Sequence, residues 1–192
     1  VLDESIAEDF KALRAVCPGD LEVVSRDDAD RLWVVFYNND ARPPCYVLYD
    51  RGTRKAEFLF STRPQLEGRP LGPMTPVTIP ARDGLRLRGY LTLPPGGESR
   101  HLPLVLLVHG GPWARDRWGW SPEALWLADR GCAVLRVNFR GSTGYGKSFL
   151  HAGDREWGAK MQDDLTDAVR WAVKSGVADP AKVAVYGGSY GG

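Results

Sequence analysis

A serine between glycines, near the C-terminus, is the residue best suited to covalent chemistry. Residues 187–191 read Gly-Gly-Ser-Tyr-Gly, which fits G-x-S-x-G, and they follow the apolar stretch 183–186. A serine hydroxyl attacks a carbonyl only when it stands clear of the fold, and a sharp strand-to-helix turn gives that exposure. A side chain at Gly187 or Gly191 would collide with the backbone closing such a turn. The pattern favours Ser189 as a nucleophile over an incidental serine in a glycine-rich tail.

A second glycine-containing motif could complete the chemistry. Residues 109–112 read His-Gly-Gly-Pro and directly follow the apolar stretch 104–108. In hydrolases with this serine turn, the loop after that strand gives one oxyanion-hole N–H and the residue after the nucleophile gives the other. We therefore predict Gly111 and Tyr190 as oxyanion donors. His109 lies upstream of the serine, whereas the α/β-hydrolase fold, in which this serine turn occurs, orders its triad Ser, Asp/Glu, His. A structural loop role for His109 is therefore favoured over a role as general base.

A competing motif matches a phosphate-binding loop. Residues 141–148 read Gly-Ser-Thr-Gly-Tyr-Gly-Lys-Ser and fit G-x-x-x-x-G-K-[ST]. Residues 138–140 separate the motif from the preceding strand, and Gly153 and Gly158 interrupt any long helix after it. No apolar strand ends in an Asp that could hold magnesium. A glycine-rich loop is the preferred interpretation, and we expect no cofactor.

Acidic and aromatic side chains are further candidates for site residues. Asp163, Asp164 and Asp167 fall near the start of a predicted helix over 161–174, where negative charge complements the helix dipole. No His or Cys is spaced to join them, so no metal site is expected. The sequence leaves open whether four tryptophans line a cleft or a core: Trp113, Trp118, Trp120 and Trp126. The candidate residues of a substrate cleft are His109, Trp113 and Tyr145.

Bulk properties exclude several classes of function. The 192 residues carry a formal net charge of +1, which gives no electrostatic case for binding nucleic acid or an anionic membrane. The longest apolar run, over 102–108, is far too short to span a bilayer, and no signal peptide is visible. The first residue is not Met, which is consistent with a cut N-terminus. Three widely spaced cysteines indicate free thiols in a reducing compartment and hence a cytoplasmic location.

The first third of the chain predicts one helix followed by four strands. Ile6, Phe10, Leu13 and Val16 recur at helical spacing over 3–16. Short strands with turn-rich breaks are predicted over 21–25, 31–37, 45–49 and 55–60. Four such strands form a propeller blade or a plain meander, and residues 32–37 are apolar on both faces, which predicts cover on both sides. A proline-rich stretch then predicts a boundary near residue 74, giving domains 1–74 and 75–192.

The remainder changes to an α/β pattern. A hairpin is predicted with its turn at Arg82-Asp83-Gly84, and Arg82, Arg86 and Arg88 are expected on a solvated strand face. Strands and helices then alternate over 104–108, 122–130, 132–138, 161–174 and 183–186. This alternation predicts a parallel sheet with helices on both faces. With the serine turn, the predicted fold class is α/β: the N-terminal half of an α/β-hydrolase, preceded by the last blade of a β-propeller.

Motifs along nearly the whole chain resemble the prolyl oligopeptidase family of serine peptidases, within it the acylaminoacyl-peptidase and dipeptidyl-aminopeptidase branch. The matching segments are 81–85, 91–96, 109–116, 138–146, 157–158 and 186–192. The resemblance implies an N-terminal β-propeller that restricts access to a hydrolase domain, and cleavage of short peptides. It implies Ser189 as nucleophile with Gly111 and Tyr190 as oxyanion donors. The family's Asp and His follow the serine, so both are expected beyond Gly192.

Three functions are compatible with these features. The leading hypothesis is a serine hydrolase that releases acylaminoacyl or dipeptidyl units from short peptides through an acyl-enzyme. A carboxylesterase is an alternative, because the same serine turn serves esters. The third is a non-catalytic binding module. A short peptide is the expected partner, with no nucleic acid and no membrane, and the sequence leaves homo-oligomerisation open.

Overall fold

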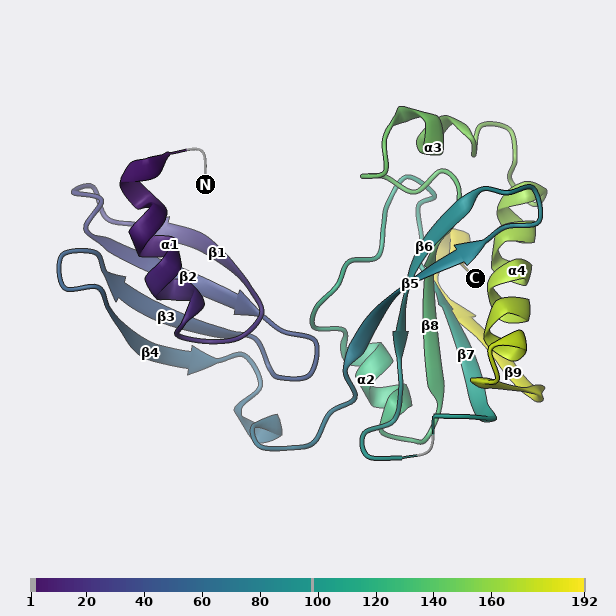
Figure 1. Cartoon of the computed structure of the whole chain (residues 1–192), viewed down its shortest axis with the longest axis horizontal. Coiled ribbons are helices and arrows are strands. Elements are labelled where there is room, and N and C mark those ends of the chain that lie inside the picture. The colour runs from purple at the N-terminus through teal and green to yellow at the C-terminus, as the bar shows by residue number, and fades with distance from the viewer. Residues whose placement is uncertain (1–2, 98, 192) are drawn as a thin grey trace. The chain divides into compact units, whose positions relative to one another are not determined.

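The computed structural model describes residues 3–97 and 99–191, and the chain divides into two compact units. The first unit extends to Arg69 and the second begins at Pro70. We expected a boundary near residue 74, but Met74 already begins a strand of the second unit and pairs with Thr92. Figure 1 labels the elements of both units.

The first unit is an antiparallel sheet with one helix. A single 3₁₀ turn, Glu4–Ile6, leads into α1 (Ala7–Arg14). The strands are β1 (Asp20–Arg26), β2 (Leu32–Asn38), β3 (Cys45–Asp50) and β4 (Lys55–Ser61), and they pair in chain order. A 3₁₀ turn, Pro64–Leu66, follows β4. The predicted helix and all four predicted strands are confirmed.

The helix α1 covers one face of this sheet. Leu13 is fully buried with Val35 and Tyr37 of β2, and the Tyr37 hydroxyl donates a hydrogen bond of 2.7 Å to the Leu13 carbonyl. The prediction for Val16 was wrong: the helix ends at Arg14 and Val16 is exposed. The other face of β2 is only half-buried among the described residues, so cover on both faces is not seen there.

The second unit is built on a mixed five-stranded sheet. Its strands are β5 (Met74–Pro80), β6 (Arg86–Thr92), β7 (Leu102–Val108), β8 (Ala133–Asn138) and β9 (Ala178–Gly187), in the order β5-β6-β8-β7-β9. The strands β8, β7 and β9 are parallel, as predicted, whereas β5 and β6 run antiparallel. The helices are α2 (Pro122–Ala128), α3 (Lys147–His151) and α4 (Lys160–Lys174).

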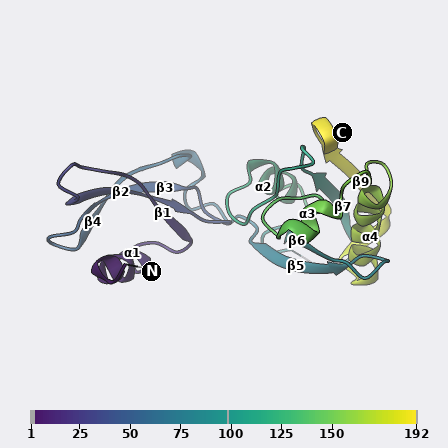
Figure 2. The ribbon, with the colours of Figure 1, turned by 90° about the horizontal axis from the view of Figure 1, so that it is seen from above.

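Helices cover both faces of this sheet, as the α/β pattern predicted. Leu106 joins the core that contains Leu165 and Ala168 of α4. Its neighbour Leu107 packs against the cluster that contains Ala124 and Ala128 of α2. Successive residues of a strand point to opposite faces, so α2 and α4 lie on different sides of β7 (Figure 2). No helix in the described part of the chain is long and apolar enough to cross a membrane.

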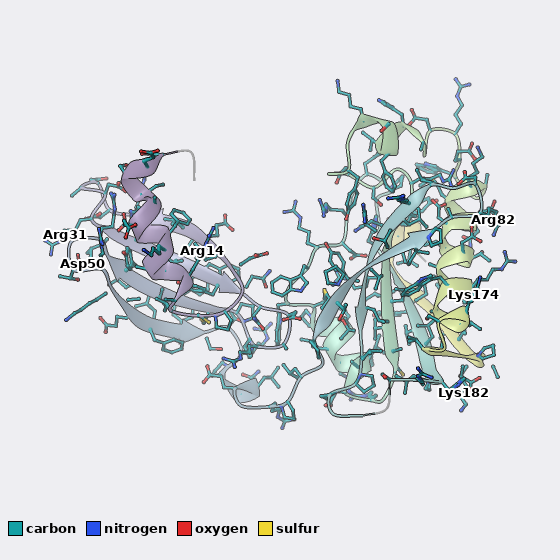
Figure 3. All side chains as sticks on the ribbon, in the orientation of Figure 1. Arg14, Arg31, Asp50, Arg82, Lys174 and Lys182 are labelled. Atoms are coloured by element: carbon teal, nitrogen blue, oxygen red, sulfur yellow. The ribbon has the colours of Figure 1, made fainter. Side chains whose placement is uncertain are left out.

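The predicted hairpin is present, but one of its arginines is not simply solvated. Ala81 and Leu85 close the turn with a backbone hydrogen bond of 2.8 Å, and Gly84 has φ of +87°. Arg82 extends from this turn to α4 (Figure 3), where it forms ion pairs with Asp163 and Asp167. Arg82 is exposed, as predicted, but it lies in the turn and not on a strand, and it also binds two carboxylates at the start of α4.

Candidate active site

Ser189 occupies a strained turn immediately after a strand. The strand β9 ends at Gly187, and a 3₁₀ turn, Ser189–Gly191, begins two residues later. The φ of Ser189 is +58°, in the left-handed region that non-glycine residues rarely adopt. Such a conformation costs on the order of 1–3 kcal/mol and persists only where the surrounding structure imposes it. This is the backbone geometry expected of a nucleophile turn.

The flanking glycines allow this turn to approach β7. A Cβ on Gly187 would meet the Gly191 carbonyl and lie 2.8 Å from the Val108 carbonyl oxygen. A Cβ on Gly191 would meet the same Val108 carbonyl. Since backbone atoms cannot move aside as a flexible side chain can, both positions require glycine. The predicted collisions at both glycines are therefore confirmed.

The loop with the second glycine motif lies against the serine turn. Val108 of β7 and Gly187 of β9 are register partners in neighbouring parallel strands, so the loops that follow them leave the same edge of the sheet. A Cβ on Gly110 would lie 3.9 Å from Ser189 Oγ. Gly111 has φ of +133°, and its N–H has no hydrogen-bond acceptor among the described residues. Within the described residues, the Gly111 N–H is therefore available to donate a hydrogen bond to a group beside Ser189.

His109 is held by contacts within its own surroundings. Its Nδ1 lies 2.8 Å from the Gly110 carbonyl oxygen and its Nε2 lies 3.0 Å from Ser142 Oγ. Its ring stacks on Phe139 with the centroids 4.5 Å apart. Both ring nitrogens are therefore engaged away from the serine, which favours the structural loop role. The ring also lines a hollow of about 320 Å³ with Gly187 and Gly188.

Among the aromatic residues predicted from the sequence, Trp113 is linked to the serine turn indirectly, by its contact with Trp157. Trp113 is 64% exposed and its ring contacts Trp157, which is 57% exposed and contacts Tyr190 in turn. Trp157 was missed as a site residue from the sequence, although Trp157-Gly158 was among the family-like segments. Trp118 instead donates a hydrogen bond to the Met74 carbonyl. The guanidinium of Arg130 lies over the ring of Trp126, which belongs to α2. Trp113, Trp118 and Trp126 therefore have different surroundings.

Tyr145 lies in a different surrounding. Its hydroxyl accepts hydrogen bonds from Asn138 Nδ2 at 2.8 Å and Arg115 Nη2 at 3.1 Å. Its ring lines a separate hollow of about 230 Å³ formed mainly by β5 and β6 residues, including Pro76 and Tyr90. The structure therefore does not bring Tyr145 to the hollow that His109 lines beside the serine turn.

A buried arginine that sequence reasoning did not single out fixes the loop after β8. The Arg140 backbone N–H and guanidinium donate to Asp164, and its guanidinium also donates to Asp83 of the hairpin turn. Hydrogen bonds from Arg140 lower the pKa of Asp83 to about 2. Asp164 is fully buried, and its pairing with Arg140 is a contact that the helix-dipole interpretation of this side chain did not include.

The glycine-rich loop 141–148 has structural contacts in place of a phosphate-loop geometry. Thr143 N–H donates to the Ala114 carbonyl, and Gly144 lies against the Arg115 guanidinium. The following helix α3 has five residues. Nor do residues 3–97 and 99–191 contain a group of three or more His, Cys, Asp or Glu side chains that could hold a metal ion.

Comparison with known proteins relates the chain to peptidases. The model of the prolyl oligopeptidase family matches residues 118–192. The whole chain is 51% identical to dipeptidyl aminopeptidase BIII of Pseudoxanthomonas mexicana and 41% identical to dipeptidyl peptidase family member 6 of Caenorhabditis elegans. It spans 29% of the length of each of these relatives. A puromycin-hydrolyzing peptidase of Mycobacterium tuberculosis matches 84% of this chain and 25% of its own, with a TM-score of 0.73 and 29% identity.

Proposed function

Because residues 118–192 match the model of the prolyl oligopeptidase family and the whole chain is 51% identical to a dipeptidyl aminopeptidase, we propose that it supplies the nucleophile and oxyanion hole of a serine peptidase that cleaves short peptides. The observation that carries the proposal is the strained backbone of Ser189, with the loop of Gly110 and Gly111 lying against it. Neither feature is needed by a glycine-rich tail, and both are needed by a nucleophile turn.

In the proposed reaction, Ser189 Oγ attacks the peptide carbonyl carbon and the C–N bond then breaks. The serine proton passes through a histidine to the leaving amine, and an ester between Ser189 and the acyl group remains. Water hydrolyses this ester and regenerates the hydroxyl. The N–H groups of Gly111 and Tyr190 would bind the oxyanion, each contributing about 3 kcal/mol of barrier reduction.

The base and its orienting carboxylate are proposed to lie C-terminal to the serine. This fold orders its triad Ser, Asp/Glu, His, and the relatives are much longer than these 192 residues. His109 precedes Ser189 and has both ring nitrogens engaged. A histidine beyond residue 192 of the full-length protein therefore fits the role of base better than His109 does.

The proposed architecture follows from the two units. The second unit has parallel strands β8, β7 and β9 with helices on both faces, which supports the N-terminal half of an α/β-hydrolase domain. The first unit has four antiparallel strands in chain order, which supports the last blade of a β-propeller. A cytoplasmic location, expected from the free thiols of Cys17, Cys45 and Cys132, stays a prediction.

We propose dipeptides released from a free amino terminus as the product, because the relative identical at 51% of positions is a dipeptidyl aminopeptidase. Release of an acylated amino acid is the alternative within the resembling branch. The full-length protein should be assayed on dipeptidyl amides, N-acetyl-aminoacyl amides and simple esters. Hydrolysis of esters alone would replace the peptidase proposal with a carboxylesterase.

An activated fluorophosphonate tests the nucleophile directly. The full-length protein should be labelled at Ser189, and Ser189→Ala should abolish labelling without loss of folding. Residues 1–192 alone should not be labelled, because no histidine base is available next to Ser189 among the described residues. Absence of labelling in the full-length protein would favour a non-catalytic binding module.

A further inference from the structure

One buried ring contacts both loops that carry the proposed oxyanion donors. Phe139 follows β8 and is fully buried. Its ring stacks on His109, two residues before Gly111, at a centroid distance of 4.5 Å and an interplanar angle of 14°. It also stacks on the ring of Tyr190 at 5.4 Å and 29°. The two donor loops, which leave different strands, thus share one contact surface.

The peptide group that joins Phe139 to Arg140 is held by hydrogen bonds at both of its polar atoms. Its carbonyl accepts hydrogen bonds from the Ser142 backbone N–H at 3.0 Å and from Ser142 Oγ at 2.6 Å. The next residue, Arg140, donates its backbone N–H to Asp164 of α4 at 2.9 Å. The Arg140 guanidinium then joins Asp164 to Asp83 of the β5–β6 turn. The ring therefore has a fixed place relative to the sheet and to α4.

This arrangement matters for the reaction because an oxyanion hole works through donors that are already in place. The two N–H groups must converge on one oxygen, and misplacing a reacting group by about 1 Å can cost about a hundredfold in rate. The backbone of Gly111 has φ of +133° and that of Ser189 has φ of +58°, so neither loop is held in place by ordinary backbone preference. A rigid ring between them supplies that restraint.

We infer that Phe139 is a positioning residue that holds the Gly111 and Tyr190 donors in their mutual geometry. The inference rests on the proposed function, since it assigns these two N–H groups to the oxyanion. Phe139 acts through the rings of His109 and Tyr190 and does not touch substrate. Its loss should lower transition-state stabilisation while leaving ground-state binding of substrate nearly unchanged.

A second buried phenylalanine provides the matched control. Phe149 belongs to the same hydrophobic core as Phe139 and is also buried. Its ring makes an edge contact with Tyr145 and none with His109 or Tyr190 among the described residues. Phe139→Leu and Phe149→Leu remove the same atoms from one core, so a general loss of packing should affect both alike.

The experiment compares the two variants in the full-length enzyme. For Phe139→Leu we expect kcat to fall about tenfold to a hundredfold with KM changed less than about threefold. Affinity for a peptide aldehyde, whose hemiacetal oxygen occupies the oxyanion hole, should fall by the same factor as kcat/KM. For Phe149→Leu we expect a comparable decrease in Tm with kcat within about twofold of the wild type.

Equal kcat values for the two leucine variants, or unchanged aldehyde affinity in Phe139→Leu, would overturn the inference. If Phe139→Leu does not fold, Phe139→Met, whose longer and more flexible side chain adapts to an irregular site, is judged by the same comparison. Failure of the proposed function is a separate result, since the wild-type enzyme would then show no fluorophosphonate labelling at Ser189. A labelled wild type with unaffected Phe139 variants rejects only the positioning role.

Discussion

Gly110 lies so close to Ser189 that a Cβ on Gly110 would be 3.9 Å from Ser189 Oγ and 3.2 Å from the Gly188 carbonyl oxygen. The proximity arises from the sheet, because Val108 and Gly187 are register partners at the ends of β7 and β9. On this side, the space beside Ser189 is therefore bounded by backbone. A carbonyl group of a substrate can approach there without meeting a side chain from residue 110.

Gly187→Ala should destabilise the protein strongly. Its methyl would meet the backbone carbonyls of Gly191 and Val108, and overpacking against rigid atoms costs about 1–3 kcal/mol or more. Gly188→Ala is the matched control, because a Cβ there has no atom within 4 Å, and its effect should stay within about 0.5 kcal/mol. Urea denaturation of both variants measures the difference, and equal midpoints would contradict the packing described here.

Asp164→Ala should cost far more stability than Asp163→Ala, although the residues are neighbours on α4. Asp164 is fully buried and accepts three hydrogen bonds from Arg140, and removing one partner of a buried pair typically costs about 3–5 kcal/mol. The Asp163 side chain is 42% exposed and pairs with the exposed end of Arg82, which is worth about 1 kcal/mol or less. The free energies of unfolding of the two variants give the comparison.

The Asp83–Arg140 ion pair should make stability depend on acid pH. The pKa of Asp83 is lowered to about 2 by Arg140, below the ordinary value of 3.8. A depressed pKa contributes stability that is present above the unfolded value and is lost as pH falls through the folded value. Between pH 4 and pH 2 the wild type should therefore lose more stability than Asp83→Asn.

The size of this pH effect should be modest, because the Asp83 side chain is 39% exposed and solvent weakens such a pair to about 1 kcal/mol or less. Thermal unfolding of both proteins across this pH range measures it. The two stability curves should converge near pH 2, and parallel curves throughout would show that Asp83 does not contribute.

In the first unit, Tyr37→Phe should cost about 1 kcal/mol. The Tyr37 hydroxyl donates to the Leu13 carbonyl inside the core, and loss of such a buried hydrogen bond has a cost of this order. The carbonyl keeps a second donor, the Val16 N–H, which limits the loss. Tyr46→Phe on the half-buried opposite face is the control, with an expected change below about 0.5 kcal/mol in the unfolding free energy.

Local patterns predicted the elements and the serine turn, because these depend on neighbouring residues. A short apolar run bounded by turn residues indicated β2, and the glycines around Ser189 indicated the turn. The partners of Arg140 could not be predicted in this way. Asp83 and Asp164 are 57 and 24 residues distant along the chain and meet Arg140 because the fold brings the β5–β6 turn and α4 to the loop after β8.

The same limit explains the aromatic residues. A tryptophan or tyrosine near a motif in the sequence does not reveal whether its ring turns toward that motif. Trp157 lies in the segment before α4, and its ring contacts that of Tyr190. The hydroxyl of Tyr145 instead accepts hydrogen bonds from Asn138 and Arg115. Side-chain direction in loops depends on contacts that no short periodicity encodes.

Because Ser189 has a left-handed backbone, selection for stability and selection for activity should favour different amino acids at this position. Glycine adopts this conformation without steric cost, whereas serine and alanine both carry the strain. A library varied at residue 189 and sorted only for heat resistance should become enriched in glycine. For the same library sorted for turnover, the proposed nucleophilic role predicts that serine is recovered.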